Sequence, residues 1–251
     1  MRAPVIHPLH VGDGERDRAT FVMGAPPTPI TIPFVMFYIE AGGRRILVDT
    51  GVGAPEATAR HHHPMSQRPE QTPLAALARL GVRPGDIDVV VNTHLHWDHC
   101  SNNHLFPKAT IYAQRAEFQY ALAPLPLHVW AYDSDGLFEP SPRMPPFLGA
   151  RLTLIEGDLE IAPGVTIWHT PGHTPGLQSV VVQGASGRYV IASDNVPLLD
   201  NLPGRHRPYF TPNGIHVDLA AYYRSFERIA AAGATILPSH DASVLDRDRY
   251  E

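Results

Sequence analysis

The sequence has little cysteine, little charge and no long apolar run. Its single cysteine, Cys100, excludes an internal disulfide and is typical of a reducing compartment, so we predict a cytoplasmic protein. The longest apolar stretch covers residues 30–39, about half of the ~20 residues that a helix needs to cross a bilayer. The first residues contain no apolar run of signal-peptide length. We therefore expect neither a membrane anchor nor a leader peptide.

Basic residues are also too few for nucleic-acid binding. The chain has 20 Lys+Arg against 25 Asp+Glu, and its formal net charge is −5 with histidine neutral. Binding to a phosphate backbone normally needs a basic patch or stripe, so we expect no nucleic-acid partner. With 43% apolar and 18% charged residues, the 251-residue chain is neither disordered nor fibrous and can bury a core.

Two residue types are abundant. The 26 prolines are about twice the usual share of ~5%, which predicts many fixed, non-helical connections rather than a helix bundle. The 15 histidines are also numerous, and their positions along the chain carry the functional argument. Those at 61–63 lie in a polar loop, and we expect them to form a solvated tract rather than to bind a metal.

Apolar segments bounded by turn residues predict an alternation of strands and helices. Residues 87–94 form a β-branched run that is typical of a buried strand. In the segment 72–80, Thr72 suits the N-cap of a helix, Pro73 its first position and Gly81 its stop. The same criteria predict strands over 34–40, 44–50, 109–113, 152–156, 164–170, 177–183, 188–194 and 234–238, and helices over 114–122 and 217–232.

This order of elements predicts one α/β domain over residues 1–251. Both halves of the chain run from strands to a helix and a short strand, which favours two similar layers packed sheet to sheet. Residues 123–150 are rich in proline and aromatic residues and follow no regular period. We expect them to form an ordered loop or lid.

The most informative segment is the motif at residues 93–100, THLHWDHC, directly after the predicted buried strand. His94 and His96 point the same way in an extended chain and can reach one metal ion, while Asp98 and His99 can face a second ion ~3.5–4 Å away. Buried imidazoles and carboxylates need partners or a metal to offset their desolvation. Further candidates at the ends of predicted strands are His173, Asp194 and His240.

These donors indicate the kind of metal. Imidazole nitrogens and carboxylate oxygens without thiolates favour zinc, with manganese, iron or cobalt as alternatives. We expect Cys100 to be a small buried side chain behind the motif rather than a ligand, because the ligand set is complete without it. The expected cofactor is therefore a pair of divalent metal ions.

The motif resembles that of the metallo-β-lactamase superfamily, and the similarity extends from the turn at residues 49–51 to His240. The resemblance implies an αββα four-layer sandwich. It also implies a dinuclear centre whose ligands are His94, His96 and His173 for one ion, Asp98, His99 and His240 for the other, and Asp194 for both, together with a bridging hydroxide. Asp49 would either support a ligand or turn the chain at the end of a strand.

Within the superfamily the chain is most similar to the N-acyl homoserine lactonase and pyridoxolactonase branch, on the basis of its length and of residues 86–100 and 214–218. The similarity implies a quorum-quenching hydrolase that opens a lactone, such as an N-acyl homoserine lactone. Asp98 would pass a proton to the leaving alkoxide. The branch commonly has a tyrosine where this sequence has Pro197. Either a metal alone polarises the substrate carbonyl, or Asn195, His216 or Tyr223 takes the place of the tyrosine.

Other functions remain open on the sequence. The same site could hydrolyse a thioester, as in hydroxyacylglutathione hydrolase, or a phosphotriester. A glutathione substrate would favour a basic patch, and the only basic grouping is the segment 205–207. An alternative of another class is a non-catalytic zinc-binding scaffold, although zinc storage does not need Asp98 and Asp194.

The expected partner is a small lactone or ester, and a homodimer is a candidate assembly. Aromatic side chains that could line an acyl pocket are Trp97, Trp130, Phe138, Phe147 and Phe210.

Overall fold

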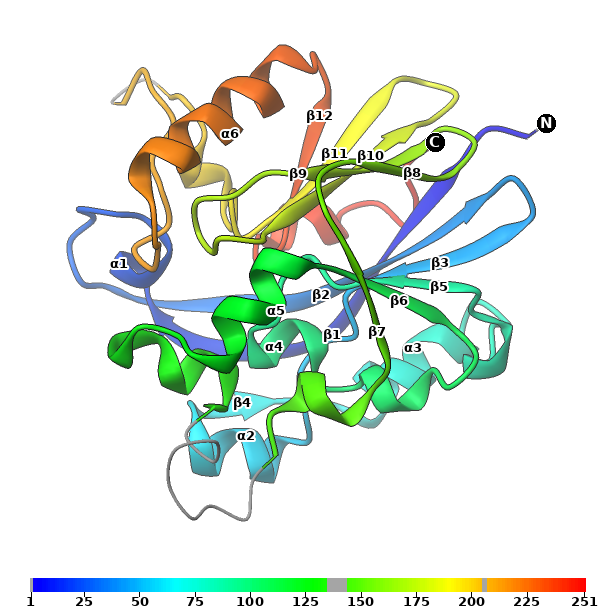
Figure 1. The fold of residues 1–251 in the computed structure, drawn as a ribbon, viewed down its shortest axis with the longest axis horizontal. Coiled ribbons are helices and arrows are strands. Elements are labelled where there is room, and N and C mark those ends of the chain that lie inside the picture. The colour runs from blue at the N-terminus through cyan, green and yellow to red at the C-terminus, as the bar shows by residue number, and fades with distance from the viewer. Residues whose placement is uncertain (1, 135–143, 205–206) are drawn as a thin grey trace.

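The computed structural model describes residues 2–134, 144–204 and 207–251, and within them two β-sheets face each other (Figure 1). One sheet has seven strands in the order β4-β1-β2-β3-β5-β6-β7, and the other has five in the order β12-β11-β10-β9-β8. The strands of the first sheet are β1 (Val5–Asp17), β2 (Pro29–Ala41), β3 (Arg44–Val48), β4 (Met65–Ser66), β5 (Val89–Val91), β6 (Thr110–Gln114) and β7 (Leu152–Ile155). Those of the second are β8 (Leu159–Ala162), β9 (Val165–His169), β10 (Gln178–Gln183), β11 (Arg188–Ser193) and β12 (Thr235–Pro238).

Each sheet buries one face against the other sheet and its outer face under helices. The helices are α1 (Arg18–Phe21), α2 (Pro55–His61), α3 (Pro73–Ala78), α4 (Trp97–Cys100), α5 (Arg115–Leu122) and α6 (Leu219–Ala231). Figure 1 shows α6 outside the second sheet, and α2 and α3 outside the first.

Alternation along the strands produces these layers. In β5, Val90 packs in the outer cluster with Leu77 of α3, while both of its neighbours in the strand pack between the sheets. In β10, Val181 packs with Phe226 of α6, and its neighbours again face the other sheet. Successive side chains of a strand point to opposite faces of the sheet, so each of these strands contributes to two hydrophobic cores. The fold is the αββα sandwich that the resemblance implied.

The N-terminal strand β1 is missing from the sequence-based prediction, which starts with residues 34–40. It pairs with β2, and β2 itself begins at Pro29. Pro8 and Gly12 interrupt the apolar pattern of β1, and its register shifts between His10 and Asp13. The short strands β4 and β8 are also missed. Where the apolar pattern of a strand is interrupted, the sequence does not show the strand, because its pairing with a distant segment is not visible locally.

Two predicted strands differ from the prediction, one in its length and the other in the sheet to which it belongs. The strand expected over 87–94 forms ladder bonds only over Val89–Val91, and the residues after it make the loop that carries the histidine motif. The strand expected over 152–156 is β7, which pairs in parallel with β6 in the first sheet. The two sheets therefore do not divide the chain into the halves that the sequence suggested. The three predicted helices correspond to α3, α5 and α6.

The segment predicted to be a lid is described only in part. Pro126–Tyr132 and Pro146–Gly149 form short 3-10 helices. Residues 135–143, with Phe138, lie outside the described residues, as do residues 205–206 of the basic grouping. A lid stays a prediction. Within the described part of the chain, no helix has the length and apolar character needed to cross a membrane.

Candidate metal centre

The predicted ligands lie in loops that follow strands, and the fold brings these loops together. The loop after β5 and the helix α4 carry the histidine motif, and the segments after β9, β11 and β12 carry the other candidates. Three groups have their ligand atoms within 4.8 Å of one another: His94, His96 and His173; His94, His99 and Asp194; and Asp98, His99 and His240. Every predicted ligand belongs to at least one group. Cys100 is buried and belongs to none of them.

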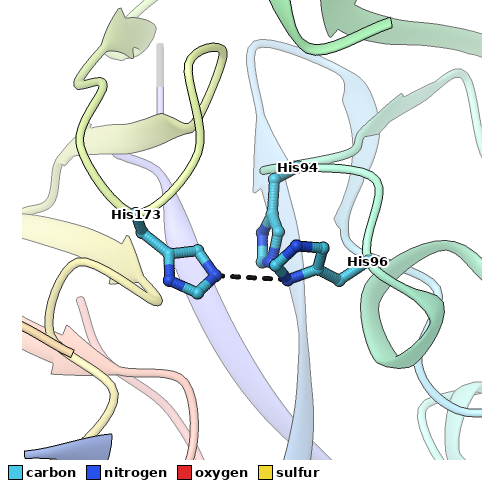
Figure 2. A group of neighbouring side chains, drawn as sticks. All are labelled: His94, His96 and His173. Atoms are coloured by element: carbon cyan, nitrogen blue, oxygen red, sulfur yellow. Dashed lines mark hydrogen bonds between the residues drawn. The ribbon is translucent and has the colours of Figure 1, made fainter. Parts of the chain in front are cut away.

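Figure 2 shows the first group, in which three imidazole rings from two loops approach one another. The His96 Nδ1 atom lies 3.0 Å from His94 Nε2 and 3.2 Å from His173 Nε2. Burial and neighbouring imidazoles lower the pKa of His94 and His96 well below the ordinary value, and burial lowers the pKa of His173 to about 4. The rings are therefore neutral at neutral pH and can offer lone pairs to a cation.

Asp194 faces both ends of the cluster, with one carboxylate oxygen toward each. Its Oδ1 lies 3.4 Å from His99 Nε2 and 3.2 Å from His240 Nε2, whereas its Oδ2 lies 3.6 Å from His173 Nε2. Asp98 Oδ2 lies 3.9 Å from His99 Nε2 and 3.8 Å from His240 Nε2. Burial raises the pKa of Asp194, but His240 and His99 together hold it well below its ordinary value. This carboxylate is therefore charged.

Two nitrogens of the cluster, His99 Nε2 and His240 Nε2, are buried without a hydrogen-bond partner among the described residues. Burial lowers the pKa of His99, but the carboxylates of Asp49, Asp98 and Asp194 together raise it well above the ordinary value. The carboxylates thus surround imidazole nitrogens, His99 Nε2 and His240 Nε2, that have no hydrogen-bond partner among the described residues. This arrangement fits cations that prefer nitrogen and oxygen ligands, and the cluster can hold two divalent metal ions.

Backbone and side-chain acceptors hold the opposite ring nitrogens. His173 Nδ1 donates to the Ile215 carbonyl oxygen at 2.7 Å, and His240 Nδ1 donates to the Pro33 carbonyl oxygen at 3.1 Å. In a neutral ring each bond favours the tautomer with its proton on Nδ1, so that Nε2 is the nitrogen that can offer a lone pair to a metal. Contacts of this kind fix the tautomer and orientation of metal-binding histidines.

Asp49 combines the two roles that the sequence left open. Its backbone is in the left-handed region, with φ of 61°, where β3 has ended and the chain turns. Its Oδ2 accepts a hydrogen bond from His99 Nδ1 at 2.8 Å, and its Oδ1 accepts one from the Thr93 amide at 2.7 Å. The turn thus carries a carboxylate that orients His99.

A buried glutamate absent from the predicted site ties two of its loops together. Glu117, on α5, accepts hydrogen bonds from the Leu95 amide at 3.0 Å, the Gly176 amide at 3.1 Å and the Tyr132 hydroxyl at 2.9 Å. Leu95 lies inside the histidine motif, and Gly176 lies in the loop of His173. In the sequence, a single glutamate on an amphipathic helix gives no signal of this role.

His62 contradicts the prediction of a solvated tract at residues 61–63. Its ring stacks on Trp97 with 4.1 Å between centroids and 8° between planes, and its Nε2 lies 2.9 Å from Asp133 Oδ1. The side chain is only 4% exposed, whereas residues 61 and 63 are exposed. A distant aspartate and a tryptophan of the motif therefore draw the ring inward, and neither contact is visible in the sequence.

The aromatic residues considered for an acyl pocket separate into two sets. Trp130 is 40% exposed and lines a cavity of about 630 Å³ together with residues 61–63 and Ile215. Trp97 is buried beneath His62, Phe147 is buried in a core cluster, and Phe210 stacks on α6. Of the described aromatic candidates, only Trp130 lines this cavity.

The residues considered as substitutes for a tyrosine at Pro197 already bond to the backbone. Asn195 donates its side-chain amide to a carbonyl oxygen at 2.7 Å, and Tyr223 donates its hydroxyl to another at 3.1 Å. His216 Nδ1 lies 2.9 Å from a third. These donor atoms are therefore used within the protein.

Comparison with known proteins relates this geometry to a family. The model of the metallo-beta-lactamase superfamily matches residues 35–240. An N-acyl homoserine lactonase of Bacillus sp is 31% identical over 169 residues, which are 63% of this chain and 61% of the relative. The N-acyl homoserine lactonase AttM of Azorhizobium caulinodans is 29% identical over 84% of this chain and 82% of its own.

The fold also matches a solved structure. An N-acyl homoserine lactone hydrolase with the product N-hexanoyl-L-homoserine bound at its catalytic metal centre superposes with a TM-score of 0.77. The two chains are 22% identical, and the superposition covers 98% of this chain and 96% of the other. At this identity the match supports the fold alone. The chain spans 61% of the length of the Bacillus relative.

Proposed function

This chain belongs to the metallo-beta-lactamase superfamily, and from that premise we propose that it is a dinuclear-metal hydrolase that opens lactone rings. The observation that carries the proposal is the position of Asp194, whose two oxygens face different imidazole groups. A shared carboxylate suits a pair of ions better than one closed structural site. Lactones, and N-acyl homoserine lactones among them, are proposed because two of the similar proteins are N-acyl homoserine lactonases.

The proposed ligands are those expected from the resemblance. His94, His96 and His173 would hold one ion, Asp98, His99 and His240 the other, and Asp194 would contact both. Zinc is the proposed metal because the donors are imidazoles and carboxylates without thiolates, and manganese, iron and cobalt accept the same donors. The hydrogen bonds from Asp49 and two backbone carbonyls, which orient the rings, support this assignment.

When bound, a pair of divalent ions would lower the pKa of bound water and polarise an ester carbonyl oxygen. The chain itself supplies the proton carrier. The Asp98 side chain is 15% exposed, against 7% for Asp194, so it is the carboxylate that a substrate can reach. Asp98 takes the proton from the attacking water and returns it to the alkoxide as the ring C–O bond breaks, leaving a hydroxy acid.

The test is turnover by protein that has been stripped with a chelator and reloaded with two equivalents of zinc. The substrates are N-hexanoyl homoserine lactone, an aryl thioester and an aryl phosphotriester, and proton release reports hydrolysis. We expect the reloaded protein, but not the stripped protein, to open the lactone. Turnover of only the thioester or phosphotriester would replace the proposed reaction, and one tightly held zinc without hydrolysis would indicate a scaffold.

The compartment and partners are also proposals. A single buried, free cysteine, Cys100, supports the cytoplasm, and a net charge of −5 supports a small molecule rather than nucleic acid as partner. A homodimer stays a prediction, which light scattering on the purified protein would test.

A further inference from the structure

The cavity lined by Trp130 opens beside the candidate metal centre. One wall includes Ile215, whose carbonyl oxygen accepts the hydrogen bond of His173. The lining also includes His62, which stacks on Trp97, the residue between the predicted ligands His96 and Asp98. A molecule whose reacting bond lies at the metals would therefore extend its remaining atoms into this cavity.

A positive charge lies against the same Trp97 ring on which the cavity residue His62 stacks. Arg16 is near the end of β1, and its guanidinium carbon is 5.6 Å from the ring centroid of Trp97 and 5.9 Å from that of Phe34. Burial lowers the pKa of Arg16 while Asp98 opposes this shift, and Arg16 in turn contributes to lowering the pKa of His63, behind burial. Arginine keeps its charge in proteins, so a cation lies within electrostatic reach of both the cavity residue His63 and Asp98.

Most N–H groups of the Arg16 guanidinium make no hydrogen bond to the described residues. Among the described residues no carboxylate lies within ion-pair distance of Arg16, and its hydrogen bond to a protein atom is a long one, 3.4 Å to the Glu15 carbonyl oxygen. The nearby Arg18, by contrast, is paired with Asp200 at 2.6 Å. The adjacent Asp17 caps the start of α1, with its Oδ1 accepting the Ala19 amide at 2.8 Å. A half-buried cation without a bonded anion is unfavourable unless a ligand supplies one.

We propose that Arg16 holds an anionic oxygen group of the substrate, so that the enzyme prefers lactones with a carboxylate on or near the ring to neutral alkyl lactones. The inference rests on the proposed function, because it assigns the substrate class of the same site. The planar guanidinium pairs with both oxygens of a carboxylate, and the rings of Trp97 and Phe34 hold it in place. His63 lines the same cavity and adds a hydrogen-bonding group near the charge.

The test compares two γ-lactones that differ in charge alone. One bears a carboxylate on the ring carbon next to the ring oxygen, and the other bears the neutral carboxamide at that carbon. We expect the zinc-loaded protein to open the carboxylate with the higher kcat/KM. Arg16→Gln should lower the carboxylate-to-carboxamide ratio about ten- to hundredfold, since a hydrogen bond to a charged group contributes about 1.5–3 kcal/mol. Arg16→Lys, which keeps the charge, should restore part of the ratio.

Arg247→Gln is the matched control. This arginine also lies over an aromatic ring, 5.8 Å from that of Tyr250, but outside the candidate site, and its loss should leave the ratio unchanged. An Arg16→Gln variant that folds and keeps the ratio within twofold of the original would overturn the proposal while leaving lactone hydrolysis intact.

A second readout separates failure of this inference from failure of the proposed function. Binding of both lactones to metal-free protein is followed by the fluorescence of Trp130 and the other tryptophans. If neither lactone is hydrolysed, tighter binding of the carboxylate that is lost in Arg16→Gln still supports the subsite. Equal binding of the two compounds contradicts it.

Discussion

Replacement of Glu117 by glutamine should weaken one metal site and spare the other. The Glu117 carboxylate accepts hydrogen bonds from backbone amides of two loops. One of these loops carries the predicted ligands His94 and His96, and the other carries His173. The ligands at the other end, His99 and His240, are oriented by Asp49 and the Pro33 carbonyl instead. Glu117 therefore acts on the first site through the backbone and touches no proposed metal.

The expected loss of stability in Glu117→Gln follows from the three hydrogen bonds that the Glu117 carboxylate accepts. In Glu117→Gln the amide oxygen can keep Leu95 and Tyr132, but the new NH₂ group then faces the Gly176 amide, and one buried donor loses its acceptor. Such a loss costs about 1–3 kcal/mol, and the two remaining bonds lose their charge assistance. We expect the free energy of unfolding to fall by about 2–4 kcal/mol in total.

Metal affinity is the decisive readout. Residues that orient metal ligands typically affect affinity by about 10–100-fold, so the first site of Glu117→Gln should weaken by that factor. Calorimetric titration of chelator-treated protein with zinc should then show one unchanged and one weakened equivalent. Tyr132→Phe removes one of the bonds and keeps its ring 4.6 Å from that of His96, so it should give a smaller change.

A control separates positioning from general loss of stability. Tyr250→Phe removes another buried hydrogen bond, to the Val244 carbonyl oxygen at 2.8 Å in a different part of the fold, and should cost about 1 kcal/mol without changing either zinc affinity. Glu117 does not position the first site if Glu117→Gln binds two equivalents of zinc as tightly as the original protein, or if both sites weaken equally.

Three other predictions concern the same cluster. Asp194→Asn should bind at most one zinc tightly and should lower lactone turnover at least about 1,000-fold, because the shared negative charge is lost; metal analysis and kinetics on one preparation would check both. Metal-free protein should lose at least roughly 3 kcal/mol of stability as the pH falls from about 6.5 to 4, because the unfolded chain protonates His173 first while its folded pKa is about 4, and because His94 and His96, whose folded pKa values are also lowered, add to the loss; urea unfolding should show this loss, and bound zinc should remove it. Gly176→Ala should destabilise by more than about 2 kcal/mol, because its Cβ would lie 2.3 Å from Glu117 backbone and side-chain atoms; unchanged thermal unfolding would contradict this packing.

The fold could be predicted where the pattern is local. A continuous apolar run such as that in residues 188–194 indicates a strand whose two faces are both buried, and Thr72, Pro73 and Gly81 mark the ends of α3. Partner strands could not be predicted, because pairing joins distant segments. β7 therefore appeared to belong with the second half of the chain, and β1, with Pro8 and a shifted register, did not appear at all.

The same division applies to the site. The candidate ligands stand out because polar groups directly after buried strands have few structural uses, and the fold brings all of them together. Glu117 and Arg16 do not stand out, since a glutamate on an amphipathic helix and an arginine in an irregular strand have ordinary surface roles. Their contacts, with loop amides and with the ring of Trp97, exist only after folding.

The dinuclear centre itself can be tested with crystals of the protein grown with zinc and measured on either side of the zinc absorption edge. We expect two anomalous peaks flanking Asp194, one among His94, His96 and His173 and the other among Asp98, His99 and His240. A single peak, or peaks away from Asp194, would contradict it.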